Sequence, residues 1–238
     1  MIRIISPRAP KDRCIERQAR RLDRRLGDDS RVYVVMPREE SKERCHQYIR
    51  QWDKDDLIVF MGHGRSDGLV GSRAVYAGMM GEEEALDKDP ELYYDDEYFI
   101  GPVNYQLLAE KKVVCFACES DLLGDELVKA GAIAVVGFGK MPSSRDEFVE
   151  ERYDKRMTTR AMIAALNGAI NVAFRDAMIM AVKMQGEMSD VAVYFKMEMR
   201  RQVSLLLHSK AKYRYFLATI LYDIAKTVKV LGDQSVKV

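Results

Sequence analysis

Two stretches 55 residues apart decide the fold of this chain: Leu57-Ile-Val-Phe-Met-Gly-His63-Gly64 and Lys112-Val-Val-Cys-Phe-Ala-Cys118-Glu-Ser120. Each contains a short run of mostly apolar residues, which predicts a buried strand. Each run ends at a reactive side chain, an imidazole in the first stretch and a thiol in the second. Because functional sites in open α/β sheets form at the carboxyl ends of the strands, we expect the two groups at equivalent positions on that edge.

Strand and helix patterns alternate through the first half of the chain. Short apolar runs predict strands at residues 3–5, 31–36, 57–61, 112–117 and 132–138. Charged or amphipathic segments between them predict helices at residues 11–26, 41–52, 104–110 and 122–130, and a short hairpin is expected at 68–76. Repeated alternation of strand and helix indicates a mainly parallel α/β sheet with helices on both faces, a three-layer arrangement.

The second half of the chain has a different pattern. From Thr158 onward, Met, Leu and Ala recur at spacings of three and four, and the last such stripe runs from Leu217 to Leu231. This periodicity predicts about three helices, packed as a bundle or laid on the sheet. We therefore expect an α/β domain at residues 1–145 and a helical subdomain at residues 146–238, packed on that domain or on a partner.

The net charge of +1 hides an uneven distribution. Residues 1–151 carry 23 Lys and Arg against 30 Asp and Glu, whereas residues 152–238 carry 15 against 7. A basic half can bind nucleic acid, or it can be attracted to the acidic half of its own chain. The basic residues are spread along helix faces without a dense run, which favours the second interpretation. We expect any nucleic-acid binding to be weak and lost at moderate salt.

Cysteine usage and hydropathy indicate a cytoplasmic protein. The four cysteines show no repeated spacing, which is not typical of a disulfide framework and fits a reducing compartment. No secretion signal is recognisable, and the longest uncharged apolar stretch, Ala161 to Phe174, is too short to span a bilayer, so we expect no membrane partner. Cys115 and Cys118 would point to opposite faces of a strand, so we expect no metal and no cofactor there.

The two deciding stretches also resemble a known family. Gly62-His63-Gly64 and Ala117-Cys118-Glu119-Ser120, followed by the apolar run from Gly131 to Gly137, are similar to caspase-like (clan CD) cysteine peptidases, and most of all to the bacterial CHAT-type branch. The resemblance covers roughly residues 55 to 140, and the distance from His to Cys is close to the family's spacing of about 50 residues.

The resemblance implies a caspase-like three-layer sandwich and a cysteine endopeptidase that uses a thioester acyl-enzyme. Cys118 would be the nucleophile, His63 the general base or acid, and the amides of Gly64 and Cys118 the oxyanion donors. It also implies a regulated effector of bacterial defence or signalling. The partners that it implies for this chain are a protein or peptide substrate and a regulatory protein. Whether the chain also binds a second copy of itself is left open.

Substrate selectivity is where the chain departs from the family. Phe116 stands where animal caspases have Gln, so their preference for Asp at the cleavage position is not carried over. Three acidic residues follow the catalytic pair closely, and the stretch 81–98 is acidic, either as a solvated loop or as a lid. Acidic surroundings favour a substrate with Arg or Lys at the cleavage position. The candidate substrate-binding groups are the three acidic residues Asp67, Glu119 and Asp121.

Two other classes of function compete with the peptidase. Gly-His-Gly can be a plain tight turn, and a free Cys at a strand end is often buried and inert, so the chain could be an inactive caspase-like module that binds a protein partner. Gly137-Phe-Gly139 after a strand suggests a nucleotide-binding loop, but no complete Walker or dinucleotide motif is present.

Overall fold

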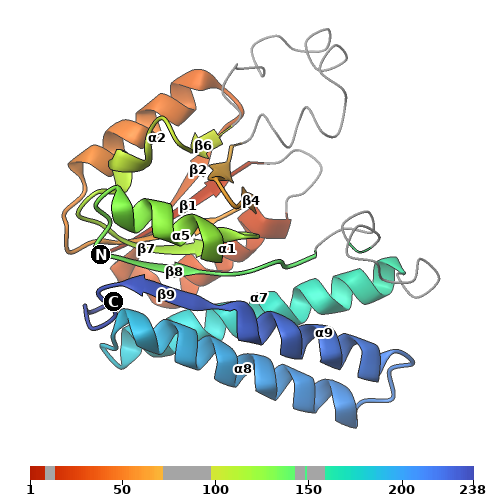
Figure 1. Ribbon diagram of the computed structural model, residues 1–238. Helices are drawn as coiled ribbons and strands as arrows, with labels where there is room; N and C mark the ends of the chain where they lie inside the picture. The colour runs from red at the N-terminus through yellow and green to blue at the C-terminus, as the bar shows by residue number, and fades with distance from the viewer. Residues whose placement is uncertain (9–13, 72–97, 143–147, 149–158) are drawn as a thin grey trace, which may run out of the picture.

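A six-stranded sheet forms the centre of the molecule in the computed structural model, which describes residues 1–8, 14–71, 98–142, 148 and 159–238. The strand order is β2-β1-β3-β7-β8-β9 (Figure 1). The first five strands are mutually parallel, and β9 pairs antiparallel with β8 at the edge. The strands are β1 (Ile2–Pro7), β2 (Ser30–Val35), β3 (Leu57–Met61), β7 (Lys112–Phe116), β8 (Ala134–Gly137) and β9 (Lys229–Gly232).

Helices cover both faces of this sheet (Figure 1). One face carries α1 (Cys14–Leu26), α7 (Arg160–Lys183), α8 (Met188–His208) and α9 (Arg214–Thr227). The opposite face carries α2 (Glu39–Gln51), α5 (Ser120–Lys129) and the 3₁₀ helix η3 (Tyr105–Leu108), while a second short 3₁₀ helix, η1 (Gly27–Asp29), follows α1. The predicted α/β class and the mainly parallel sheet are confirmed.

Alternation along the central strands divides the core into two layers. Met61 and Phe116 pack with α1 and the C-terminal helices, whereas Phe60 and Cys115 pack with α2 and α5. Successive side chains of a strand point to opposite faces, so a strand buried on both sides must be apolar at every position. The five residues of β3 are all buried, as this rule requires.

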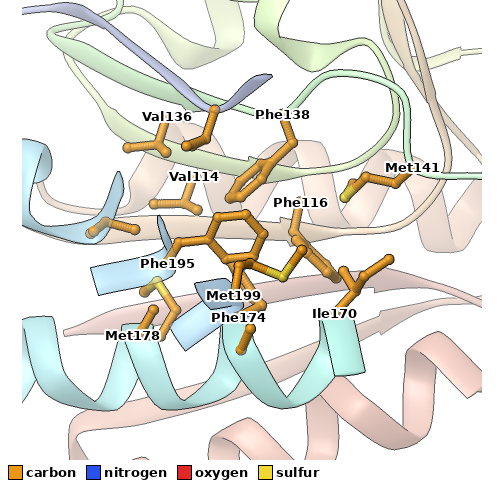
Figure 2. Close-up of a cluster of buried hydrophobic side chains, with 14 of the residues drawn as sticks. Val114, Phe116, Val136, Phe138, Met141, Ile170, Phe174, Met178, Phe195 and Met199 are labelled. Atoms are coloured by element: carbon orange, nitrogen blue, oxygen red, sulfur yellow. The ribbon is translucent and has the colours of Figure 1, made fainter. Parts of the chain in front are cut away.

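The helical half shares its core with the sheet. Phe174 of α7 stacks on Phe116 of β7 with ring centroids 3.9 Å apart, and Phe195 of α8 meets Phe138 edge-on at 5.0 Å (Figure 2). Lys229 also forms an ion pair with Asp121 at 3.0 Å across the two halves. Helices α7, α8 and α9 pack on one another and on the sheet, so the structure combines the two expected arrangements, and the contact with the sheet is mainly apolar.

The prediction of one continuous helical stripe from Leu217 to Leu231 was wrong at its end. Helix α9 stops at Thr227, Val228 is extended, and the chain continues as β9, in which Leu231 is paired with Val135. Without β9, the edge of β8 would present unpaired backbone groups. Pairing with that edge, helped by the β-branched residues at 227, 228 and 230, outweighs the helical periodicity.

A second, smaller sheet follows His63. It is antiparallel, with the order β4-β5-β6, and consists of β4 (Gly64–Arg65), β5 (Gly68–Val70) and β6 (Tyr98–Ile100). The end of the predicted hairpin at 68–76 and the acidic stretch at 81–98, apart from Tyr98, lie outside the described residues. The domain boundary at 145/146 also lies outside them.

Within the described ranges, α7 is the one helix whose length and composition would allow it to cross a membrane. Of its most apolar window, 44% is buried inside the fold. Core helices pass the same test, so this feature does not indicate a compartment.

Candidate functional site

The pairing of β3 with β7 brings the two reactive side chains to the same level. The register runs from Leu57 opposite Lys112 to Met61 opposite Phe116, a constant offset of 55 residues. The Gly62 amide continues the ladder beyond the strands by donating to the Phe116 carbonyl at 3.3 Å. The same offset relates His63 to Cys118, so the two residues leave adjacent parallel strands at equivalent positions.

His63 and Cys118 line one pocket of about 240 Å³ at this edge of the sheet. Cys118 is partly exposed, and its Sγ donates a hydrogen bond to the Met141 carbonyl at 3.3 Å. The pocket is bounded by β3, β7, the start of α1, the segment after β8, and α7; the described lining residues are Cys14, Ile15, Gly62, His63, Phe116, Cys118, Met141, Asn167, Ile170 and Asn171. The predicted pair of imidazole and thiol therefore shares a cavity.

The chain turns sharply from β7 into α5 immediately after Cys118. The Ala117 amide donates to the Cys115 carbonyl at 2.8 Å, and Glu119, the N-cap of α5, has a left-handed backbone with φ of 55°. Non-glycine residues adopt this conformation rarely, so the surrounding contacts must impose it. The turn places Cys118 one residue before the N-cap of α5, while its side chain packs against the layer of α1 and α7.

Gly64 approaches the backbone of Cys118 too closely for any other residue. A Cβ built on Gly64 would lie 2.6 Å from the Cys118 carbonyl oxygen and 2.8 Å from the Ala117 Cβ. Glycine is the residue that permits such backbone contact. The two residues predicted to supply the oxyanion amides therefore adjoin each other in space through their backbones.

Ser120 holds the turn together, a role that the sequence analysis missed. The side chain is fully buried; its Oγ accepts a hydrogen bond from the Phe138 amide at 2.9 Å. The hydroxyl proton can be donated to the carbonyl of Cys115 at 2.6 Å or of Ala117 at 2.8 Å. These bonds tie the turn to both β7 and β8. The available signal was a serine two residues after Cys118 and two residues before the helix predicted at 122–130.

Substituting Ser120 by Ala should destabilise the protein by about 1–3 kcal/mol, because the buried Phe138 amide loses its acceptor. Urea unfolding followed by circular dichroism measures this change. Ser204→Ala, on the exposed surface of α8, is the matched control and should stay within about 0.5 kcal/mol of wild type. Equal stability of the two variants would show that the Ser120 hydroxyl does not hold the turn.

The other thiol of the Cys115-x-x-Cys118 pair lies on the opposite face of the sheet. Cys115 is fully buried with the α2 and α5 layer, whereas Cys118 packs against the layer of α1 and α7. Burial raises the pKa of the Cys115 thiol to about 12, and it does the same for Cys45. Among the residues that the structure describes, no group of three or more His, Cys, Asp or Glu could hold a metal ion.

The three acidic residues expected to bind substrate do not line the pocket. Glu119 forms an ion pair with Lys140 at 3.7 Å, and Asp121 forms the ion pair with Lys229. Asp67, in the turn before β5, accepts a hydrogen bond from the Tyr98 hydroxyl at 2.9 Å. In the structure these carboxylates contact other groups and are not among the described residues that line the pocket.

Three polar residues of the pocket were not recognised in the sequence. Cys14 comes from the start of α1, and Asn167 and Asn171 come from α7. The signal for the asparagines was present, since they stand four residues apart in a helix that is otherwise rich in Ala, Ile and Met. Residues at this spacing lie on one face of a helix.

No protein-family model, no curated protein and no solved structure matches this chain. The functional interpretation therefore rests on the residues that meet in the pocket.

Proposed function

We propose that this protein is a cysteine endopeptidase of the caspase-like type, with Cys118 as the nucleophile and His63 as its acid–base partner. The observation that carries the proposal is the position of the two residues, at the same level beyond adjacent parallel strands and in one pocket. The mainly parallel sheet with helices on both faces also agrees with the three-layer sandwich that the family resemblance implies. Acyl transfer by a thiol requires a nucleophile and an acid–base group at one site, and the pocket brings these two residue types together.

Acylation would begin with attack of the Cys118 thiolate on the scissile carbonyl carbon, forming a C–S bond and a tetrahedral oxyanion. The amides of Gly64 and Cys118 would stabilise this charge, which is greatest in the transition state. The C–N bond then breaks, and the imidazolium of His63 gives its proton to the departing amine. The product is a thioester of Cys118.

Deacylation would use water. His63, now neutral, takes a proton from the attacking water, whose oxygen forms a bond to the thioester carbon. The C–S bond breaks, and the sulfur leaves as thiolate while the substrate fragment leaves as a carboxylic acid. This step restores the starting enzyme without any cofactor.

The resemblance further supports a cytoplasmic, regulated effector of bacterial defence that cleaves a protein substrate after activation by a partner. An unregulated endopeptidase would damage its own cell, so we propose that a regulatory protein or a second copy controls access to the pocket.

Alkylation of the four cysteines at neutral pH tests the proposal within a single molecule. We expect iodoacetamide to modify Cys118 at least about tenfold faster than Cys14, because the proposed pairing with the His63 imidazole favours the thiolate of Cys118. The buried thiols of Cys45 and Cys115, with pKa values near 12, should stay unmodified in the native protein and serve as internal controls. Mass spectrometry of timed digests gives the rates.

The same alkylation measurement on His63→Ala can contradict the proposal. If His63 activates the thiol, the rate at Cys118 should fall by about tenfold or more. If the alkylation rate of Cys118 is the same in this variant as in the wild type, and equals that of an ordinary exposed thiol, the proposed catalytic pair is wrong.

An inactive interaction module is the second candidate. It is favoured by large apolar side chains on the outer surface of the helical half, where Leu205 is 57% exposed and Tyr215 is 66% exposed. Such residues mark partner surfaces when they gather into a patch. An unreactive Cys118 in the alkylation experiment would favour this candidate over the peptidase.

A further inference from the structure

Apart from His63 and Cys118, the described lining of the pocket consists of uncharged side chains. Its other described lining residues are apolar at Ile15, Phe116, Met141 and Ile170, and neutral polar at Cys14, Asn167 and Asn171. No Asp, Glu, Lys or Arg stands among the described residues that line it. A charged side chain that entered would lose hydration without gaining a counter-charge from these wall residues, which is unfavourable.

The neighbouring carboxylates do not supply a charge to the described wall of the pocket. Glu119 and Asp121 are turned toward Lys140 and Lys229, with which they form ion pairs. Only 12% of the Asp121 side chain is exposed, and its partner belongs to the edge strand β9. These acidic groups are already neutralised locally, so the described residues offer no attraction for Arg or Lys inside the pocket.

Asn171 gives the pocket a fixed hydrogen-bonding group. Its Nδ2 donates to the Asn167 carbonyl one turn earlier on α7, at 2.7 Å. This bond uses one N–H of the amide and holds the side chain in place, which leaves Oδ1 as an acceptor that Asn171 can offer to an occupant. Asn167 adds a second amide on the same face of α7.

We infer that the pocket binds the side chain of the substrate residue that carries the scissile carbonyl. It selects an uncharged side chain with an amide group, which is Gln or Asn. The inference rests on the proposed function, because a carbonyl placed at Cys118 Sγ carries its own side chain into the cavity that Cys118 lines. The amide NH₂ of that side chain donates to Asn171 Oδ1, and its aliphatic stem packs on Phe116 and Ile170. The helical half thereby supplies the selectivity of a site whose reactive groups come from the sheet.

A series of peptidyl electrophiles tests the inference without requiring turnover. The four probes share one sequence and differ in the residue before the reactive group, which is Gln, Leu, Arg or Asp. The rate of adduct formation at Cys118, measured by mass spectrometry, should be at least about tenfold higher for the Gln probe than for the Arg and Asp probes.

Variants of Asn171 provide the decisive comparison. Asn171→Asp places a carboxylate on the wall, so the Arg probe should gain at least about tenfold relative to the Gln probe. Asn171→Leu should lower the rate ratio of Gln to Leu by a similar factor. Gln202→Glu introduces the same charge on α8, away from this pocket, and should leave all ratios unchanged.

The outcomes separate the two hypotheses. Equal rates for the Gln and Arg probes, or ratios insensitive to both Asn171 variants, would overturn the inference while the peptidase proposal stands. Failure of all four probes to label Cys118 would overturn the peptidase proposal and the inference with it.

Discussion

Cys118→Ala is expected to reduce peptide cleavage by on the order of 10³-fold or more, and His63→Ala should have an effect of similar size. The first variant removes the atom that forms the thioester, and the second removes the only imidazole among the described pocket residues. Because the two groups act as a unit, the double variant should be hardly worse than either single variant. Cleavage of a diverse fluorogenic peptide library measures all three.

His208→Ala is the matched control for this experiment. It removes an exposed imidazole at the end of α8, away from the pocket, and should leave the cleavage rate within about threefold of wild type. Thermal unfolding should show that all variants keep the fold, because His63 and Cys118 lie beyond strand ends and not within the sheet. Wild-type cleavage by Cys118→Ala or His63→Ala would refute the assignment.

Removing the helical half should have the second large effect: residues 1–145 alone are expected to aggregate and to show no activity. Truncation uncovers the sheet face that includes Val114, Phe116 and Phe138, all of which pack against α7 and α8 in the intact chain. Exposed apolar surface of this extent leads to association. The truncation also removes β9 from the edge of β8, and Asn167 and Asn171 from the pocket.

Size-exclusion chromatography and the probe-labelling assay measure this outcome. Phe174→Ala in the full-length chain weakens the same contact between the helices and the sheet. It should lower the free energy of unfolding by about 3–5 kcal/mol, because the ring stacks on Phe116 and is 1% exposed. Tyr215→Ala, in the same half but 66% exposed, should cost less than about 0.5 kcal/mol. A soluble and fully active 1–145 fragment would show that the helices form an independent module.

The expected positions of the catalytic pair followed from local information. Each apolar run predicts a strand wherever it lies in the fold, and parallel strands present the same end to the same edge. The positions of the acidic residues could not be derived in this way. Glu119 and Asp121 are neighbours of Cys118 in sequence, but the left-handed turn at Glu119 starts α5 and directs them to Lys140 and Lys229.

The end of the chain shows the same limit. Residues 217–231 keep a helical spacing of apolar groups, and Leu231 is apolar in either a helix or a strand. Whether it becomes a strand depends on the unpaired edge of β8, which is formed by residues almost a hundred positions earlier. Periodicity within a segment carries no information about a distant backbone edge.

By itself, the sequence determined the α/β class, the mainly parallel sheet, the strands that lead to His63 and Cys118, and the helical character of residues 160–227. These features depend on hydrophobic period and chain direction, which are local properties. Tertiary structure alone decided that α7 closes the pocket with Asn167 and Asn171, that Ser120 ties the turn to β8, and that β9 completes the sheet. Those contacts join segments far apart in the chain, and their stability comes from burial and pairing that exist only once the whole core has formed.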